Sequence, residues 1–221
     1  SSAAGLARDK RRKLAAAIGA AGSLAELHAA LTSIWTDPAA LLQPHWQCAA
    51  AGAAAFPAAF PAAPSPAEQL MLADARTYLP ADILVKVDRA AMAASLETRA
   101  PFLDHRVAAV AWRLPLAMKI RPGKGSGSSK WALRQLLHRY VPPALIERPK
   151  AGFAMPIGAW LRGPLRGWAE DLLDPQLLHR QGYLQSEPIW RLWRAHQRGA
   201  DHTPQLWSVL MWQAWLAEWG P

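Results

Sequence analysis

The chain has 221 residues, of which 52% are hydrophobic, and its formal net charge is +9. This length allows one large or two small domains with a real core. No run of about 18 uncharged apolar residues occurs, so we expect no membrane span. The single cysteine, Cys48, excludes an intrachain disulfide and a cysteine metal cluster, which fits a reducing cytoplasm.

The basic residues are spread along the chain rather than gathered in one cluster. The 25 Lys and Arg residues are mostly Arg, and many stand beside Trp or Leu in segments with helical periodicity. That pattern is typical of solvated helix faces. The net charge alone would permit contact with an anionic partner, but we expect no binding to nucleic acid.

The N-terminal region, residues 1–42, has a helical pattern. A basic cluster followed by small residues predicts a surface helix over residues 8–18. Ser23 and Glu26 form a capping box, which begins a helix predicted to run to about Trp35. The next segment, residues 43–65, is rich in Ala and Pro, and we interpret it as a linker or an irregular surface loop.

The helical pattern becomes strong after this segment. A Ser-Pro pair followed by Glu68 marks a helix start, with Pro66 at the first helical position. This helix is predicted to run to residue 79, where Pro80 is expected to break it. Asp82 is expected to cap the next helix, over residues 83–95.

The rest of the chain repeats this helical pattern without any alternating strand of convincing length. It also has no G-x-G-x-x-G motif, so the predicted fold class is mainly α. Six of the 12 Trp residues fall in the last two predicted helices at helical spacing, and we expect them to pack in a core. The further predicted helices span residues 105–113, 130–140, 143–148, 156–161, 164–173, 187–198 and 203–219.

One short stretch, residues 96–106, gathers five charged or titratable side chains around an apolar turn. Its first acidic residue is Glu97, whose carboxylate can form a salt bridge, bind a cation or act as a general base. The salt bridge is the commonest of these roles. Pro101 restricts the turn and holds the charged groups in fixed directions, which favours a functional role.

A second polar cluster surrounds Lys150, which follows a proline and precedes Gly152. Glycine permits the close approach of a ligand, and a lysine in such a loop suits phosphate binding as a point charge. A solvated surface lysine is the commoner alternative. Asp82 and Asp88 do not share a helical face, so capping and ion pairing are commoner roles for them than binding Mg²⁺. The seven His residues show no metal-ligand spacing, so no metal site is expected from histidine.

Two blocks of sequence together resemble a known family. YLPADILVKVDRAAMAASLETRAPFLDHRV (residues 78–107) and LIERPKAGFAMPIGAWLRGPL (residues 145–165) resemble the C-terminal synthetase domain of glutamine-dependent asparagine synthetases. The resemblance covers roughly residues 66–220. We therefore assign residues 66–221 to the helical C-terminal part of such a domain. The resemblance implies an adenine-nucleotide α-hydrolase-like fold, a PP-loop ATPase domain built on a parallel sheet.

The resemblance also implies a reaction. Such domains use ATP and Mg²⁺ to adenylate the side-chain carboxylate of aspartate, and ammonia from a glutaminase domain then displaces AMP. By this resemblance Glu97 helps to form the acyl-adenylate and takes a proton from ammonia, while Lys150 neutralises phosphate charge. Ser95 and Leu96 are then expected to line the nucleotide. The remaining motif residues are expected to orient the site: Asp88, Arg99 and Asp104.

The sequence also lacks three features of the family. The S-G-G-x-D-S pyrophosphate loop, the N-terminal Cys of the glutaminase domain and the parallel sheet are absent from the sequence. We therefore expect the helical C-terminal half of a synthetase domain, inactive alone, with most of the Mg²⁺ ligands in the upstream part. A homodimer is expected for the full-length protein. Two alternatives stay open: a non-catalytic helical module for binding or assembly, and a relative that amidates another carboxylate.

Overall fold

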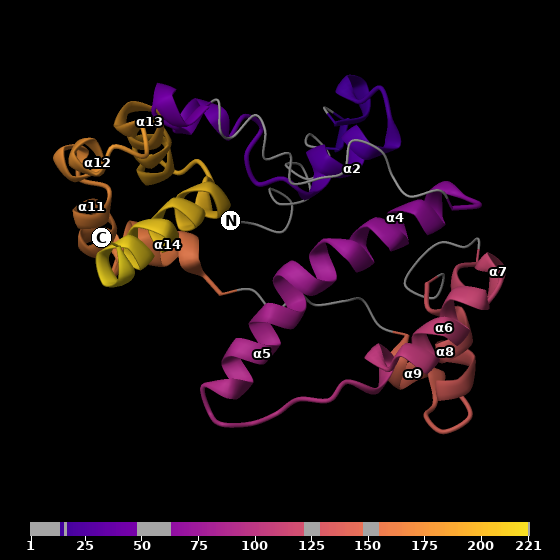
Figure 1. Ribbon diagram of the computed structural model, residues 1–221. Coiled ribbons are helices and arrows are strands. Elements are labelled where there is room, and N and C mark those ends of the chain that lie inside the picture. Colours follow the sequence, from indigo (N-terminus) through magenta and orange to yellow (C-terminus); the bar gives the residue numbers. More distant parts are fainter. Residues whose placement is uncertain (1–13, 16, 48–62, 122–128, 148–154, 221) are drawn as a thin grey trace. The chain divides into compact units, whose positions relative to one another are not determined.

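A computed structural model describes residues 14–15, 17–47, 63–121, 129–147 and 155–220. The described residues are mainly helical and contain no strand, only two isolated β-bridges, so the prediction of a mainly α fold is confirmed (Figure 1). The chain divides into two units. Unit 1 combines residues 1–60 with residues 155–221, and unit 2 is formed by residues 61–154.

Unit 1 joins the two ends of the chain. The carbonyl of Leu41 accepts a hydrogen bond of 2.7 Å from the backbone N–H of Gln185, and Gln43 N–H donates to the carbonyl of Tyr183 at 2.9 Å. The indole N–H of Trp35 donates to Ser208 Oγ at 3.0 Å. The elements of unit 1 are α2 (Leu24–Thr32), η1 (Ala39–Leu41), α10 (Ile157–Arg162), α11 (Arg166–Leu172), α12 (Pro175–Gln181), α13 (Ser186–Gln197) and α14 (Thr203–Trp219).

A closed apolar core holds unit 1 together. Trp193 of α13 is almost fully buried, as predicted for the tryptophans of the last two helices. The prediction is wrong for Trp212, Trp215 and Trp219, which are exposed on α14 because this helix is apolar on both faces and only one of them packs inward. The buried apolar residues of the core are Leu41, Leu161, Ala169, Leu173, Leu178, Leu184, Ile189, Trp193, Leu206, Val209 and Leu210.

The junction of α10, α13 and α14 is a buried polar network around His196. Its Nε2–H donates to the carbonyl of Gly158 at 3.1 Å, and its Nδ1 accepts from the backbone N–H of His202 at 3.3 Å. Arg162 donates to the carbonyls of His196 (2.8 Å) and Ala200 (2.9 Å). Because a Cβ at Gly158 would stand 2.5 Å from the Thr203 hydroxyl oxygen, only glycine lets the helices approach this closely.

Unit 2 contains the two blocks that carry the sequence resemblance, except for the part of the second block beyond residue 154. The long rod drawn through α4 and α5 in Figure 1 begins the unit. Its elements are α4 (Pro66–Arg76), the π-helix η2 (Leu79–Leu84), α5 (Val85–Met92), η3 (Pro101–Leu103), α6 (His105–Arg113), α7 (Leu116–Lys119), α8 (Trp131–Leu137) and α9 (Pro143–Ile146).

Capping signals predicted two helix starts correctly and one incorrectly. Ser23 Oγ accepts from the backbone N–H of Glu26 at 3.2 Å, as the capping box predicts, and Ser65 Oγ accepts from that of Glu68 at 3.3 Å at the predicted helix start. The predicted break at Pro80 is wrong, because the helix continues through this residue in the wider π form. Asp82 is therefore not a cap: it lies within η2, and its carboxylate pairs with Lys86 Nζ at 2.9 Å.

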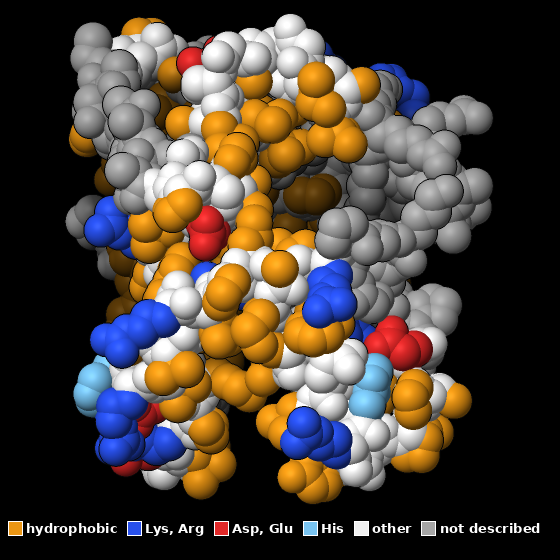
Figure 2. All heavy atoms as spheres, turned by 90° about the vertical axis from the view of Figure 1, so that its right-hand side faces the viewer, with side chains coloured by type: hydrophobic (Ala, Val, Ile, Leu, Met, Phe, Trp, Pro, Cys, Tyr) orange, Lys and Arg blue, Asp and Glu red, His pale blue; other side chains and the backbone are white. Residues whose placement is uncertain are grey.

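Unit 2 lacks a core of the kind found in unit 1. Among its described residues only Ala73 is buried, and Figure 2 shows one face of the molecule on which hydrophobic side chains lie open between Lys and Arg side chains. An ion pair between side chains links two of its helices. Lys119 of α7 lies 3.7 Å from Glu68 of α4, and both side chains are largely shielded from solvent.

The predicted domain division and the predicted lack of a membrane span can be compared with the structure only over the described residues. The segment 43–65 lies mostly outside the described residues, so the division into 1–42, 43–65 and 66–221 stays a prediction. In the described part of the chain, no helix is both long and apolar enough to cross a membrane.

Candidate active site

The end of α5 sets the course of the chain into the predicted site. The backbone N–H of Leu96 donates to the carbonyl of Ala91, and that of Ser95 donates to the carbonyl of Met92. These two bonds form a Schellman motif, whose C′ residue adopts the left-handed conformation. Ser95 holds that position with φ of +56°, where glycine is usual. This strained residue directly precedes Leu96 and Glu97, so the motif fixes where both side chains leave the helix.

Glu97 forms an ion pair with a close sequence neighbour. Its Oε1 lies 2.5 Å from Arg99 Nη2, and the two side chains are 69% and 85% exposed. Such an open pair contributes little to stability, because water screens it and both side chains lose freedom. The pair is therefore accessible, and a negatively charged ligand can displace Glu97 from Arg99 without disturbing a core.

Asp104 begins α6 and is held by one arginine. Its carboxylate accepts from the backbone N–H of Arg106 at 2.8 Å, and the guanidinium of Arg106 donates to both carboxylate oxygens at 3.0 and 2.8 Å. The bonds from the Arg106 side chain, and then those from backbone N–H groups, lower the pKa of Asp104. Asp104 is thus ionised and serves as the N-cap of α6.

The other predicted residues are only partly brought together. Asp88 lies on α5 and pairs with the adjacent Arg89 at 2.5 Å. Among the described residues, neither Asp88 nor Asp104 pairs with Glu97 or Arg99. Lys150 lies outside the described residues, so its predicted place opposite Glu97 stays a prediction.

Sequence reasoning missed a shielded ion-pair cluster in the same unit. Arg134 Nη1 lies 2.7 Å from Glu147 Oε1, and His138 Nε2 lies 3.4 Å from the same oxygen. Arg134 and Glu147 stand thirteen positions apart, across the end of α8 and the whole of α9. No helical spacing links residues so far apart, so the sequence carried no signal for this contact. The cluster fixes the start of the segment that leads to Lys150.

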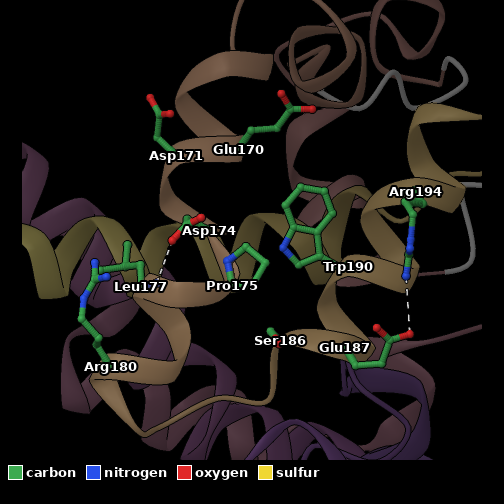
Figure 3. A pocket seen from close by; sticks show the side chains of 10 residues that line it. All are labelled: Glu170, Asp171, Asp174, Pro175, Leu177, Arg180, Ser186, Glu187, Trp190 and Arg194. Carbon is green, nitrogen blue, oxygen red and sulfur yellow. Dashed lines mark hydrogen bonds and ion pairs between the residues drawn. The ribbon is translucent and has the colours of Figure 1, made fainter.

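A pocket of about 850 Å³ lies in unit 1, between α11, α12 and α13 (Figure 3). Three of its four acidic side chains have local partners. Asp174 caps α12 by accepting from the backbone N–H of Leu177, and Glu187 accepts from Arg194 at 3.4 Å. Glu170 accepts from the indole N–H of Trp193 at 3.3 Å. The pocket therefore shows the chemistry of helix caps and surface ion pairs rather than that of a cofactor site.

The described residues show no metal site built from protein side chains alone. They contain no group of three or more His, Cys, Asp or Glu residues that could hold a metal. In the predicted site, the carboxylates of Asp88, Glu97 and Asp104 are each paired with an arginine. A cation that bound one of these carboxylates would have to displace its arginine, and Mg²⁺ is usually held by one or two carboxylates together with substrate phosphates.

Comparisons with known proteins show which protein family the sequence resembles. The sequence profile of the family described as "Asparagine synthase" matches residues 1–217. "Putative asparagine synthetase (glutamine-hydrolyzing)" of Mycobacterium tuberculosis (strain ATCC 25618 / H37Rv) is 40% identical over 155 residues, which are 69% of this chain and 23% of that protein. "Asparagine synthetase (glutamine-hydrolyzing) 1" of Bacillus subtilis (strain 168) is 32% identical over 148 residues, 66% of this chain and 22% of that protein. No solved structure gives a significant match.

The matched part of the chain spans less than a quarter of the length of these curated relatives. This agrees with the expectation that the chain corresponds to part of a synthetase. The profile itself extends over almost every residue. The chain therefore belongs to the asparagine synthase family.

Proposed function

We propose that the chain supplies the helical part of the synthetase site in an ATP-dependent amidotransferase that makes asparagine. The observation that carries this proposal is the match of the asparagine synthase family to residues 1–217. The 40% identity to a protein named asparagine synthetase supports it further. ATP, aspartate and ammonia from a glutaminase domain outside this chain are the proposed substrates and partners.

The proposed reaction has two steps. An oxygen of the aspartate side chain attacks the α-phosphorus of ATP, and pyrophosphate leaves. Ammonia then attacks the acyl carbon, and AMP leaves with the electron pair of the broken C–O bond. The attacking nitrogen must lose a proton, and Glu97 is the proposed acceptor of that proton.

The accessible Glu97–Arg99 pair suits this role. Arg99 can turn to a carboxylate or phosphate oxygen once a substrate enters, because its guanidinium is 85% exposed. Glu97 is then released to act on ammonia. Ser95 and Leu96 are proposed to lie along the nucleotide, and Lys150 to neutralise the charge on its phosphates.

The other motif residues are proposed to orient the site. Asp104 fixes the start of α6, and Asp88 holds Arg89 at the end of α5. Because the described residues show no such metal site, most ligands of any magnesium ion are proposed to come from outside them. A cytoplasmic location and a homodimer of the full-length protein also stay predictions.

Pyrophosphate release by two proteins, the purified chain and a chimaera, tests the proposal. The purified chain, given ATP, Mg²⁺, aspartate and ammonia, should release no pyrophosphate above background. A chimaera in which the chain replaces the matching region of the M. tuberculosis relative should release pyrophosphate in an aspartate-dependent way. Steady release by the chain alone would contradict the idea that it holds only part of the site.

The role of Glu97 is tested in the same chimaera. Glu97→Gln keeps the size of the side chain but removes the proton acceptor, and it should lower kcat for asparagine formation by about 10²-fold or more. The matched control is Glu187→Gln, which changes an exposed carboxylate of α13 in unit 1. Equal rates for both variants would remove Glu97 from the chemistry. If pyrophosphate release depended on a different carboxylic acid instead of aspartate, that acid would be the acceptor of the ammonia.

A further inference from the structure

Arg134 on α8 lies at the centre of a shielded set of polar contacts. Its Nε donates to the carbonyl of Ser129 at 3.0 Å, and its Nη1 donates to Glu147 Oε1 at 2.7 Å. The side chains of Arg134 and Glu147 are 14% and 30% exposed, far less than those of the open ion pair described above. Water and salt therefore screen this pair less, so it can hold the end of α9 in place.

The shape of the guanidinium explains how one side chain reaches both acceptors. Its planar fork presents N–H groups in fixed directions, so a bond to one acceptor also sets the direction of the other. Ser129 is itself held, because it pairs with Ile120 in an isolated β-bridge. Beside it, the Arg121 guanidinium lies 3.7 Å from the centre of the Trp131 ring. Arg134 thus joins a held carbonyl at the start of α8 to a carboxylate at the end of α9.

Glu147 is held through its backbone as well as its side chain. It is the C-cap of α9, and its N–H donates to the carbonyl of Pro143 at 2.7 Å. His138, one turn after Arg134 at the end of α8, places its Nε2 3.4 Å from the same carboxylate oxygen of Glu147. Contacts from α8 and α9 therefore fix both the main chain and the side chain of Glu147.

The chain that leaves this anchor reaches Lys150 within three residues. A peptide chain spans at most about 3.6 Å per residue, so the Cα atoms of Glu147 and Lys150 lie within about 11 Å of each other. The sequence also restricts the connection, because Pro149 has a fixed φ and disfavours the helical region for Arg148 before it. A displacement of Glu147 would therefore move Lys150.

We propose that Arg134 is a positioning residue of the synthetase site, which holds Glu147 and thereby keeps the Lys150 ammonium beside the phosphates of ATP. The inference rests on the proposed function, under which Lys150 neutralises phosphate charge. Arg134 touches no substrate in this arrangement and acts only through Glu147 and the short connection that follows it. Such positioning matters, because a misplacement of about 1 Å can lower a rate by about 100-fold.

An ATP analogue that carries an acyl group on its γ-phosphate tests the place of Lys150 without any need for asparagine formation. A lysine amine held beside the phosphates attacks the acyl carbon and loses a proton, and ATP leaves with the electron pair of the broken C–O bond. In the chimaera with the M. tuberculosis relative, mass spectrometry of the digested protein should find the label on Lys150. An excess of ATP should prevent the labelling.

Substitutions at the anchor should slow this labelling. Arg134→Gln should lower the labelling rate of Lys150 by about tenfold or more, because a hydrogen bond between charged groups is lost. Glu147→Ala should lower it by a similar factor, and the double variant should lower it no further. Arg134→Lys keeps the charge but not the fork, so it should restore the rate only in part. The matched control is Arg166→Gln, which removes a bond of 2.9 Å to Glu170 in unit 1 and should leave the labelling unchanged.

The affinity for ATP separates positioning from a general loss of structure. Arg134→Gln should raise the dissociation constant of ATP by about fivefold or more in the chimaera. In a chimaera that already carries Lys150→Ala, the same change should raise it by less than about twofold, since the residue through which Arg134 acts is gone. A variant that only unfolds part of the chain would weaken ATP binding equally in both backgrounds.

The outcomes distinguish this inference from the proposed function. In a chimaera that makes asparagine, labelling of Lys150 that changes by less than about twofold in Arg134→Gln and Glu147→Ala would overturn the positioning role and leave the proposed function in place. An equal rise of the dissociation constant in both backgrounds would overturn it in the same way. A parent chimaera that binds ATP but is never labelled at Lys150 would remove that lysine from the phosphates, and would count against its proposed role as well as against this inference.

Discussion

Unit 1 should lose stability as the pH falls below about 6.5, because His196 is buried in the form that carries no charge. Its Nε2 holds the proton and donates to Gly158, while its Nδ1 accepts from the His202 N–H and faces Arg162 Nη2 at 3.4 Å. A second proton on Nδ1 would meet two donors and a positive charge. Burial first, and then the charge of Arg162, lower the pKa of His196.

The direction and size of the effect follow from proton linkage. Since the pKa in the folded chain lies below that in the unfolded chain, the unfolded chain binds more protons between the two values. The contribution of His196 is complete above pH 6.5 and is lost as the pH falls from there toward the folded pKa. One proton taken up on unfolding gives a slope of about 1.4 kcal/mol per pH unit.

Asp201, which also acts on His196, does not produce the same slope in this range. Asp201 has a lowered pKa, mainly because the Thr203 hydroxyl donates to its carboxylate at 2.6 Å. Its contribution is lost only as the pH falls below its unfolded value of about 3.9. The charge of Arg162 does not change at these pH values. The comparison of the chain with a variant that lacks His196, between pH 5 and 7, therefore separates the effect of His196 from those of Asp201 and Arg162.

Urea unfolding followed by tryptophan fluorescence measures the effect, since Trp193 stacks beside His196 with ring centroids 6.3 Å apart. The matched control is His196→Gln, whose amide can donate to Gly158 and accept from the His202 N–H without titrating. The difference in unfolding free energy between the two proteins should depend on pH below 6.5 and be constant above it. A difference that is constant from pH 7 to pH 5 would refute this account of the junction.

Two further predictions concern single residues. Ser95→Gly should stabilise the end of α5 by up to about 1 kcal/mol, because glycine adopts positive φ without strain. In the chimaera it should also raise KM for ATP if the hydroxyl lies along the nucleotide, and a thermal melt with no gain would contradict the strain. Trp193→Ala should cost about 3–5 kcal/mol in urea unfolding, since it empties the core of unit 1. Trp219→Ala should stay within about 0.5 kcal/mol, because Trp219 is 71% exposed, and equal costs would refute the difference in packing.

Signals that act over three or four residues predicted the fold best. The bounds of α6 and α14, residues 105–113 and 203–219, are confirmed at both ends. The helix start at Ser65 was predicted correctly because its partner, Glu68, lies in the same turn. The start of α12 was missed although Asp174 caps it with a proline at the first helical position, the same signal that was used at Ser65.

Features that depend on packing could not be predicted in this way. The helix continues through Pro80 as a π-helix, whose hydrogen bonds span one residue more than those of the α-helix that the sequence pattern assumes, so the expected break does not occur. The Glu97–Arg99 pair is local and follows from the charged stretch. The contact of Arg134 with Glu147 depends on where α9 lies against α8, which no spacing in the sequence encodes. The exposed tryptophans of α14 differ from Trp193 only in which face of a helix they occupy.

The hydrogen bonds that join Leu41 and Gln43 to the turn before α13 make unit 1 a discontinuous domain, into which unit 2 is inserted. Folding of unit 1 must therefore close a loop formed by residues 61–154 together with the segment before it. Loop closure of about a hundred residues costs about 4 kcal/mol in chain entropy, and the cost grows only with the logarithm of length. Any ordering of unit 2 that draws its two ends together would lower this cost and so favour the pairing of the distant segments of unit 1.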